Sequence, residues 1–264
     1  MTVYSPYIAR LIKAGKLADG HHEVCHNCGG KGIVSAYVPY PEHGPDIPIY
    51  KRQAHYKTNP PVWEDCWVCS KDRAISKLLD ACGLVEFPTF EQFSVTGRLE
   101  SKKQAKQAAV KFSQTPSGFL TLYGSYGTGK SMLAKCIVYQ AIQDGCPAYY
   151  TTAPEMVGQI RARFSESPAD VDQAIRHYAE KGLLVIDELD KVNQTSWVEE
   201  TIQRIIDKRY NDQSATVLVM NVEPGKMPGY LASRINGGVV VQVPEPDMRQ
   251  VLKMKKEHEN GNQF

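Results

Sequence analysis

The sequence contains no long run of apolar residues and carries almost no net charge. No stretch approaches the roughly 18 apolar residues of a membrane-spanning helix, and Pro6, Arg10 and Lys13 interrupt any apolar core of a secretory leader. The formal net charge of +2 favours neither a nucleic acid nor a membrane as partner. We therefore expect a cytoplasmic protein with no membrane partner, whose seven cysteines are thiols or metal ligands.

The C-terminal part of the chain alternates short apolar runs with amphipathic segments. Because the apolar runs are continuous, they predict strands that are buried on both faces and joined by helices in a parallel α/β sheet. The predicted strands are 119–123, 148–152, 183–187, 216–221 and 239–243, and the predicted helices are 129–144, 154–164, 168–180, 195–212 and about 228–235. A polar segment over 98–112 also has apolar positions near helical spacing.

A glycine-rich loop lies between the first of these strands and the helix that follows it. Residues 124–131, GSYGTGKS, match the phosphate-binding pattern G-x-x-x-x-G-K-[ST]. Glycines let backbone N–H groups approach an anion closely, and the positive end of the following helix dipole points to the same place. We expect Lys130 to reach the β- and γ-phosphates of a nucleotide and the Ser131 hydroxyl to bind Mg²⁺.

Polar residues end two further predicted strands. Asp187 and Glu188 follow the apolar run LLVI, which suits a carboxylate in the Mg²⁺ shell next to a base for the attacking water. Asn221 ends the run TVLVM, where an amide would orient that water, although an ordinary turn residue is the alternative. Charge stabilisation in the transition state requires an arginine, and the spacing does not choose among the candidates Arg209, Arg234 and Arg249.

The segments GSYGTGKS, LLVIDE, IIDKRYND, VLVMN and LASRI, in this order, resemble a known family. They look like the AAA+ ATPases of bacterial and phage replicative helicase loaders, the DnaC and DnaI type, to which the transposition helper IstB is related. The resemblance covers about residues 88–250. It implies a five-stranded parallel AAA+ sheet with a reduced or absent lid, Mg²⁺-dependent ATP hydrolysis, and self-association through the ATPase domains.

The resemblance also implies roles for individual residues. The implied nucleotide-binding residues are Gly124, Ser125, Tyr126, Gly127, Thr128, Gly129, Lys130, Ser131 and Met132, with Phe90 of FPTFEQF near the adenine and Arg249 at the sensor 2 position. The implied catalytic residues are Lys130, the Walker B pair Asp187 and Glu188, Asn221 as sensor 1, and Arg234 as the arginine finger. Ser131 and Asp187 are the implied Mg²⁺ ligands.

Similar loaders contact single-stranded DNA through the helices between the second strand and Walker B. Arg161, Arg163 and Phe164 lie in this region and would supply two phosphate contacts and one stacking face. The alternative is an amphipathic helix with solvated arginines and a core phenylalanine.

Four cysteines near the N-terminus form two C-x-x-C pairs. Cys25 with Cys28, and Cys66 with Cys69, match the ligand spacing of a tetrahedral zinc site. Because a domain this small has little core, we expect the zinc to be structural. The nearby histidines are expected to be surface residues: His21, His22, His26, His43 and His55. The aromatic residues of this segment form either a contact patch or the domain's own core: Tyr37, Tyr40, Tyr50, Tyr56 and Trp63.

We expect a zinc-binding, partner-interaction domain over 1–82, a linker over 83–114 and an AAA+ domain over 115–264. The favoured function is an ATP-dependent loader that binds the hexameric replicative helicase through the zinc domain, and ATP and single-stranded DNA through the AAA+ domain. An IstB-type transposition helper that assembles on DNA is the alternative. A third hypothesis, a zinc adaptor with a degenerate nucleotide site, is disfavoured by the intact Lys130, Asp187 and Glu188.

Overall fold

The computed structural model describes residues 33–36, 62–65, 67–93, 100–165, 167–193 and 195–245. The chain divides into two compact units, Met1–Lys77 and Leu78–Phe264. In the first unit, strand β1 (Ile33–Ala36) pairs antiparallel with β2 (Val62–Asp65), and Ile33 lies opposite Asp65. Helix α3 (Trp67–Ala81) begins in the first unit and ends in the second.

The second unit is built on a five-stranded parallel sheet with the order β4-β5-β6-β3-β7. Its strands are β3 (Phe119–Tyr123), β4 (Ala148–Thr152), β5 (Leu183–Asp187), β6 (Thr216–Met220) and β7 (Val239–Gln242). The three central strands, β5, β6 and β3, are almost wholly buried, whereas the edge strands β4 and β7 are partly exposed. The predicted parallel α/β sheet is confirmed, with β6 and β7 each one residue shorter than expected.

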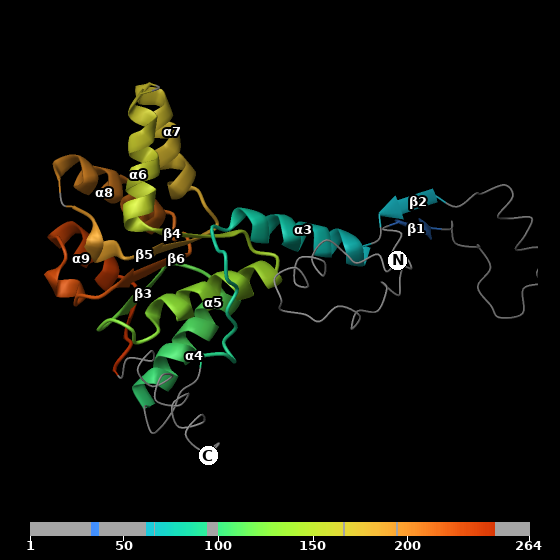
Figure 1. Ribbon diagram of the computed structural model, residues 1–264, viewed down its shortest axis with the longest axis horizontal. Coiled ribbons are helices and arrows are strands. Elements are labelled where there is room, and N and C mark those ends of the chain that lie inside the picture. The colour runs from blue at the N-terminus through green and yellow to red at the C-terminus, as the bar shows by residue number, and fades with distance from the viewer. Residues whose placement is uncertain are drawn as a thin grey trace, which may run out of the picture. The chain divides into compact units, whose positions relative to one another are not determined.

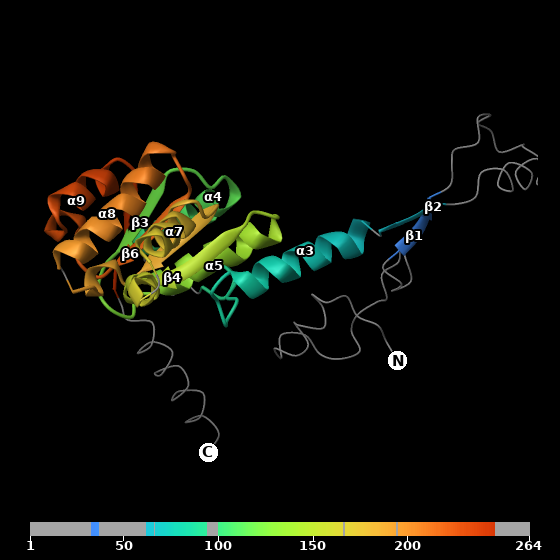
Figure 2. The same cartoon turned by 90° about the horizontal axis from the view of Figure 1, so that it is seen from above.

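Helices cover both faces of this sheet (Figure 1). They are α4 (Glu100–Gln114), α5 (Lys130–Gln143), α6 (Ala153–Ala162), α7 (Pro168–Ala179), α8 (Ser196–Asn211) and α9 (Gly229–Asn236), with single 3-10 turns η1 (Arg163–Ser165), η2 (Leu189–Lys191) and η3 (Pro224–Lys226). Figures 1 and 2 show α4 and α5 on one face and α6 to α9 on the other. Residues 83–114, expected as a linker, fall in the second unit, where α4 packs against α5.

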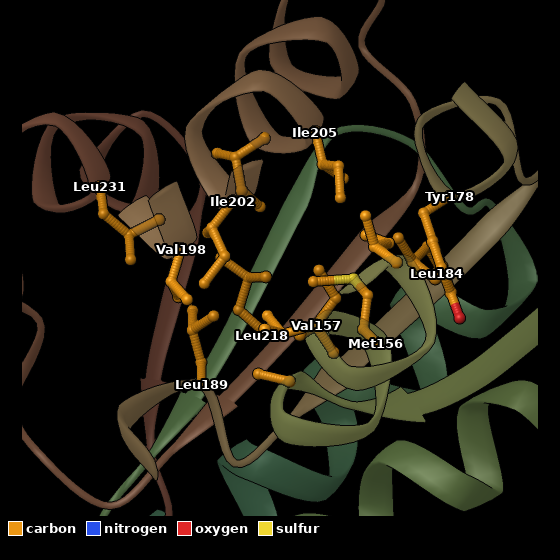
Figure 3. Close-up of a cluster of buried hydrophobic side chains, with 14 of the residues drawn as sticks. Met156, Val157, Tyr178, Leu184, Leu189, Val198, Ile202, Ile205, Leu218 and Leu231 are labelled. Carbon is orange, nitrogen blue, oxygen red and sulfur yellow. The ribbon is translucent and has the colours of Figure 1, made fainter. Parts of the chain in front are cut away.

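The helices on the second face share one hydrophobic core with the sheet (Figure 3). Met156 and Val157 of α6 and Ile202 of α8 pack over Leu184 and Leu218, which point to the same side of the sheet because side chains alternate along strands. This core fixes the helices against one face of the sheet and leaves the loops at the carboxyl ends of the strands, where ligands bind in open α/β sheets, in defined positions.

Side-chain caps explain where several helices start. Thr152 is both the last residue of β4 and the N-cap of α6, and it forms a reciprocal capping box with Glu155. Ser167 caps α7 through the backbone N–H of Asp170, and Thr195 caps α8 in the same way. At Thr152 the chain therefore turns from strand into helix directly at the carboxyl edge of the sheet, where the candidate site lies.

Candidate functional site

The glycine-rich loop connects β3 to α5 in a conformation that its glycines make possible. Gly124 has a φ of 144° and Gly129 has a φ of 100°, and residues that carry a side chain rarely adopt either value. A Cβ at Gly124 would lie 2.4 Å from the carbonyl oxygen of Val243, and one at Gly129 would lie 2.6 Å from Cε2 of Phe93. Both glycines are therefore required by backbone conformation and by close packing.

The first turn of α5 presents its backbone N–H groups without competition from a cap. Its N-cap residue is Gly129, no side chain caps the helix, and no acidic residue lies in the first turn. Such a helix start, with its positive dipole end, is suited to an anion. Ser131 is exposed in this first turn, and Met132 beside it is half-buried.

Lys130 is buried inside the loop that precedes it. Its Nζ donates hydrogen bonds to the carbonyl oxygens of Gly124, at 2.8 Å, and of Ser125, at 2.6 Å. Thr128 closes the same loop through a hydrogen bond from Oγ1 to the Ser125 carbonyl. The positive charge of Lys130 is thus fixed at the strand end, next to the open start of α5.

Asp187 ends the buried strand β5 with its carboxylate held by two donors. The backbone N–H of Glu188 donates to Oδ1 at 2.7 Å, and the hydroxyl of Tyr150 on the neighbouring strand β4 donates to Oδ2 at 2.5 Å. Burial, together with the charge of Asp187, raises the pKa of Tyr150, so its phenol remains a protonated donor. Tyr150 was not among the predicted site residues, because its position in a strand gives no sign of a partner 37 residues away.

Glu188 has an unusual backbone and a paired side chain. Its φ and ψ of 56° and 37° lie in the left-handed region, which is uncommon for a residue with a side chain and is concentrated at functional sites. Its carboxylate forms an ion pair with Lys191, with Oε1 and Nζ 2.5 Å apart. Neither the conformation nor the pair was expected from the sequence.

Asn221 is anchored to the turn that follows Glu188. Its backbone N–H donates to Oδ1 of Asp190 at 3.1 Å, and its side-chain Nδ2 donates to Oδ2 of Asp190 at 3.2 Å. The side chain is half-buried just beyond the end of β6, which separates β5 from β3 in the sheet. Asp190 is a second site residue that sequence analysis missed, although it lies only three positions after Asp187.

The three candidate arginines have different surroundings. Arg209 is fully buried, and its guanidinium donates to Thr216 Oγ1 and to backbone carbonyls that include those of Lys181 and Ala215. Burial lowers the pKa of Arg209 to about 10. Arg209 thus ties the chain before β5 to β6 and cannot reach a neighbouring subunit, which removes it as a candidate finger.

Arg234, by contrast, lies on α9 with a partly exposed side chain. Its Nε donates to Oδ1 of Asp207 at 2.8 Å, and its guanidinium lies 4.9 Å from the ring centroid of Tyr210. Arg249 lies outside the described residues. The finger assignment of Arg234 and the sensor 2 assignment of Arg249 stay predictions.

Among the aromatic residues of FPTFEQF, Phe93 lies against the glycine-rich loop. Phe93 is buried and lies against Gly129, while Phe87 packs against Tyr139 of α5 at a ring-centroid distance of 5.7 Å. Phe90 is also buried. Its expected place near an adenine stays a prediction.

Aromatic and basic side chains gather where α6 ends and α8 begins. The ring centroids of Phe164 and Trp197 are 4.8 Å apart, and the guanidinium of Arg161 lies 5.2 Å from the Trp197 ring centroid. Phe164 is 53% exposed, which excludes the core position that was the alternative for it. Arg163 is exposed beside it and lines a hollow between α6 and α7 together with Gln159, Asp170 and His177.

The predicted zinc ligands lie outside the residues whose side chains are described. Cys25, Cys28 and Cys66 are not described, and Cys69 is described only as part of the α3 backbone. Within the described residues, no group of three or more His, Cys, Asp and Glu side chains forms a metal site. In the same part of the chain, no helix is long and apolar enough to cross a membrane.

A glycine-rich loop after a central parallel strand, with a buried aspartate at the end of another, defines this unit as a P-loop nucleotide-binding domain of the AAA+ class. The chain belongs to the family of IstB-like ATP binding proteins, whose match covers residues 63–227, more than half of the sequence. Its fold and family are thus those expected from the motifs.

Curated relatives include replication proteins. The chain is 24% identical over 149 residues to the replicative helicase loader DnaC of Escherichia coli K12, a match that covers 56% of this chain and 60% of that protein. It is 27% identical over 170 residues to the chromosomal replication initiator protein DnaA of Oenococcus oeni, covering 60% of this chain and 37% of that one. The chain thus matches less than two thirds of the length of either relative.

Solved structures with the same fold include a DnaC helicase loader and a DnaA protein. The DnaC structure has a TM-score of 0.52 at 18% identity and covers 58% of this chain and 95% of that one. DnaA of Aquifex aeolicus bound to AMPPCP has a TM-score of 0.56 at 20% identity, covering 65% and 55%. At these identities the likeness establishes the AAA+ fold alone.

Proposed function

We propose that this chain is an ATPase that loads the replicative DNA helicase. The observation that carries the ATPase proposal is the arrangement of the sheet edge, where the buried Lys130 and the doubly held carboxylate of Asp187 lie at the ends of strands separated by one strand. A binding-only site would need neither Glu188 next to Asp187 nor an anchored amide at Asn221.

Each side chain has a role that follows from its chemistry. Lys130 and the N–H groups that start α5 bind the β- and γ-phosphates, and Ser131 and Asp187 are the oxygen ligands that Mg²⁺ prefers. Bound Mg²⁺ would neutralise the charge that develops on the transferred phosphoryl group. Glu188 takes the proton of the attacking water, and Asn221 orients that water.

Two substitutions separate nucleotide binding from hydrolysis. Lys130→Ala should lower ATP affinity by about 100-fold or more, because it removes the cation that pairs with the phosphates. Glu188→Gln should leave affinity near that of the unsubstituted protein and abolish turnover, because an amide accepts no proton. Fluorescent-nucleotide titration and steady-state phosphate release measure the two quantities, and normal hydrolysis by Glu188→Gln would remove Glu188 from its role.

The four cysteines support a structural zinc in the partner-binding part of the chain. The register of the β1–β2 pair places Ile33, five residues after Cys28, opposite Asp65, the residue before Cys66. The strand pairing thus places Ile33 and Asp65 at the same end of the ribbon, and a four-cysteine site needs its two C-x-x-C pairs to come close together in the same way. Zinc would supply the stability that a small core lacks.

Single-stranded DNA is the proposed ligand of the surface formed by Arg161, Phe164 and Trp197. An exposed ring that is packed edge-on against a second ring offers a stacking face, and the adjacent guanidinium offers a phosphate contact. This part of the proposal rests on the exposure of Phe164.

The loader proposal is supported by the DnaC relatives, while the IstB-like family match keeps a transposition helper as the second candidate. Native mass spectrometry of the full chain with a bacterial replicative helicase hexamer distinguishes the two. A defined complex that is lost in Cys66→Ser/Cys69→Ser supports the loader and gives the cysteine segment its role. No complex with the helicase, together with ATP-dependent assembly on DNA, supports the transposition helper.

A further inference from the structure

A single 3-10 turn contacts both side chains that act on the attacking water in the proposed reaction, Glu188 and Asn221. The turn η2 begins immediately after Glu188 and ends at Lys191, and its first residue, Leu189, is buried in the hydrophobic core. At one end of the turn Lys191 pairs with Glu188, and in its middle Asp190 accepts the hydrogen bonds of Asn221. The buried Leu189 fixes the backbone of the turn, which sets where the side chains of Asp190 and Lys191 begin.

The pairing of Lys191 with Glu188 opposes the proposed role of Glu188. A carboxylate acts as a general base by offering an electron pair to the proton of water. In this structure the ammonium of Lys191 donates a charge-assisted hydrogen bond to Oε1, which engages one of the roughly four lone pairs of the carboxylate and fixes its orientation. Glu188 is free to turn toward the attacking water only when Lys191 moves away.

Lys191 is also placed beside the nucleotide loop. Its Nζ lies 5.8 Å from the ring centroid of Tyr126, which is 64% exposed on the glycine-rich loop. Lys191 and Glu188 have side chains that are 40% and 37% exposed, so the pair is open to solvent and weak enough to break. An exposed lysine on a flexible stem can therefore restrain Glu188 without locking it.

We propose that Lys191 is a positioning residue that restrains Glu188 and keeps the basal rate of ATP hydrolysis low. This inference rests on the proposed ATPase function and concerns the regulation of that same site. The expected effect is on turnover rather than on nucleotide binding, because the ion pair of Lys191 is with the base, whereas its contact with the loop is a cation–π contact with the exposed Tyr126 ring.

The test is steady-state ATP hydrolysis by the full chain at saturating Mg²⁺-ATP without DNA. Lys191→Met should raise kcat about two- to five-fold, the change expected on loss of an exposed ion pair, with KM unchanged within about twofold. Lys191→Arg keeps the charge and should restore the low rate. Lys208→Met is the matched control, because Lys208 forms an ion pair of similar exposure with Asp212 away from the site, and it should leave kcat unchanged.

Other outcomes overturn the inference in different ways. An unchanged or lower kcat in Lys191→Met, or a higher KM alone, would show that Lys191 does not restrain Glu188. Nucleotide binding without hydrolysis in both the unsubstituted chain and Lys191→Met would overturn the ATPase proposal, and the inference with it. Hydrolysis at equal rates in the two proteins would overturn the inference and leave the ATPase proposal standing.

Discussion

The hydroxyl of Tyr150 on β4 donates a hydrogen bond of 2.5 Å to Oδ2 of Asp187 at the end of β5. Asp187 is 3% exposed, and its other carboxylate oxygen accepts from the backbone N–H of Glu188. The carboxylate proposed to hold Mg²⁺ is therefore oriented by a phenol on one side and by the backbone on the other. Groups that orient metal ligands in this way affect metal affinity although they do not touch the metal.

Tyr150→Phe removes one of these two donors. We expect it to lower the free energy of unfolding by about 1–2 kcal/mol without Mg²⁺-nucleotide, because a buried carboxylate oxygen loses its partner. Urea denaturation measures the change, and titration with Mg²⁺ in the presence of nucleotide should show weaker Mg²⁺ binding. In an Asp187→Asn background the stability loss should be smaller, since the acceptor is then neutral. Equal losses in the two backgrounds would mean that the Tyr150–Asp187 bond is not the cause.

Arg209 is a structural residue, so its substitution should affect folding and not nucleotide binding. Arg209→Lys keeps the charge but loses the planar fork that reaches several carbonyls, and we expect a loss of about 2–4 kcal/mol in unfolding free energy. Arg204→Lys on the same helix is the matched control, because its pair with Asp172 is exposed, and its effect should stay within about 0.5 kcal/mol. Unchanged stability of Arg209→Lys would contradict the structural role.

The sheet and the glycine-rich loop were predictable because their signals are local in the sequence. The run 183–187 predicts a buried strand from its own composition, and GSYGTGKS carries its loop conformation in its glycines. The partners of Arg209 and Asp187 were not predictable in this way. Arg209 is satisfied by carbonyls up to 31 residues away and Asp187 by a phenol 37 residues away, and only the packed fold brings them together.

Exposure of Phe164 was equally hidden in the sequence. The helical pattern over 154–164 allowed a buried ring, but α6 ends at Ala162 and the 3-10 turn η1 carries Phe164 outward to Trp197. Hydrophobic periodicity does not show that the last residues of a helical pattern form a 3-10 turn of three residues, which changes the direction of their side chains.

The stacking surface should contribute to affinity for single-stranded DNA. Phe164→Ala is expected to weaken binding about tenfold, since one stacked base contributes about 1–3 kcal/mol. Phe164→Leu keeps an apolar side chain without a ring face and should show most of the same loss. Arg161→Ala should reduce the salt dependence of binding by about one phosphate contact. Fluorescence anisotropy with a labelled oligonucleotide gives both quantities, and unaltered affinity of Phe164→Ala would exclude this surface.

Thiol reactivity should distinguish the predicted zinc ligands from the other cysteines. Cys82 and Cys136 are buried, and burial raises the pKa of Cys136 to about 12, so both thiols should stay unmodified in the native protein at neutral pH. Cys146 is half-buried and should react slowly. Mass spectrometry of alkylated peptides provides the measurement.

A chelator should add a second group of reactive cysteines. If zinc is bound, Cys25, Cys28, Cys66 and Cys69 become modified only when a strong chelator removes the metal, and zinc release should accompany their reaction. Immediate modification of these four without any released zinc would show that they hold no metal.

Arg234 is oriented by contacts that leave it partly exposed. Asp207 accepts from Nε, and Tyr210 lies under the guanidinium, so the side chain is held at the surface of α9 and α8. An arginine that serves a neighbouring subunit needs this combination of orientation and access. Arg234→Ala should therefore bind ATP with unchanged affinity and lose most hydrolysis.

Mixing two inactive variants tests whether Arg234 acts in trans. Lys130→Ala lacks a working nucleotide site but keeps its arginine, whereas Arg234→Ala keeps the site and lacks the arginine. In a mixed assembly, a Lys130→Ala subunit next to an Arg234→Ala subunit completes one working site, so an equal mixture should recover up to about a quarter of the normal rate on statistical grounds. No recovery in mixtures that co-assemble would mean that Arg234 acts within its own subunit or not at all.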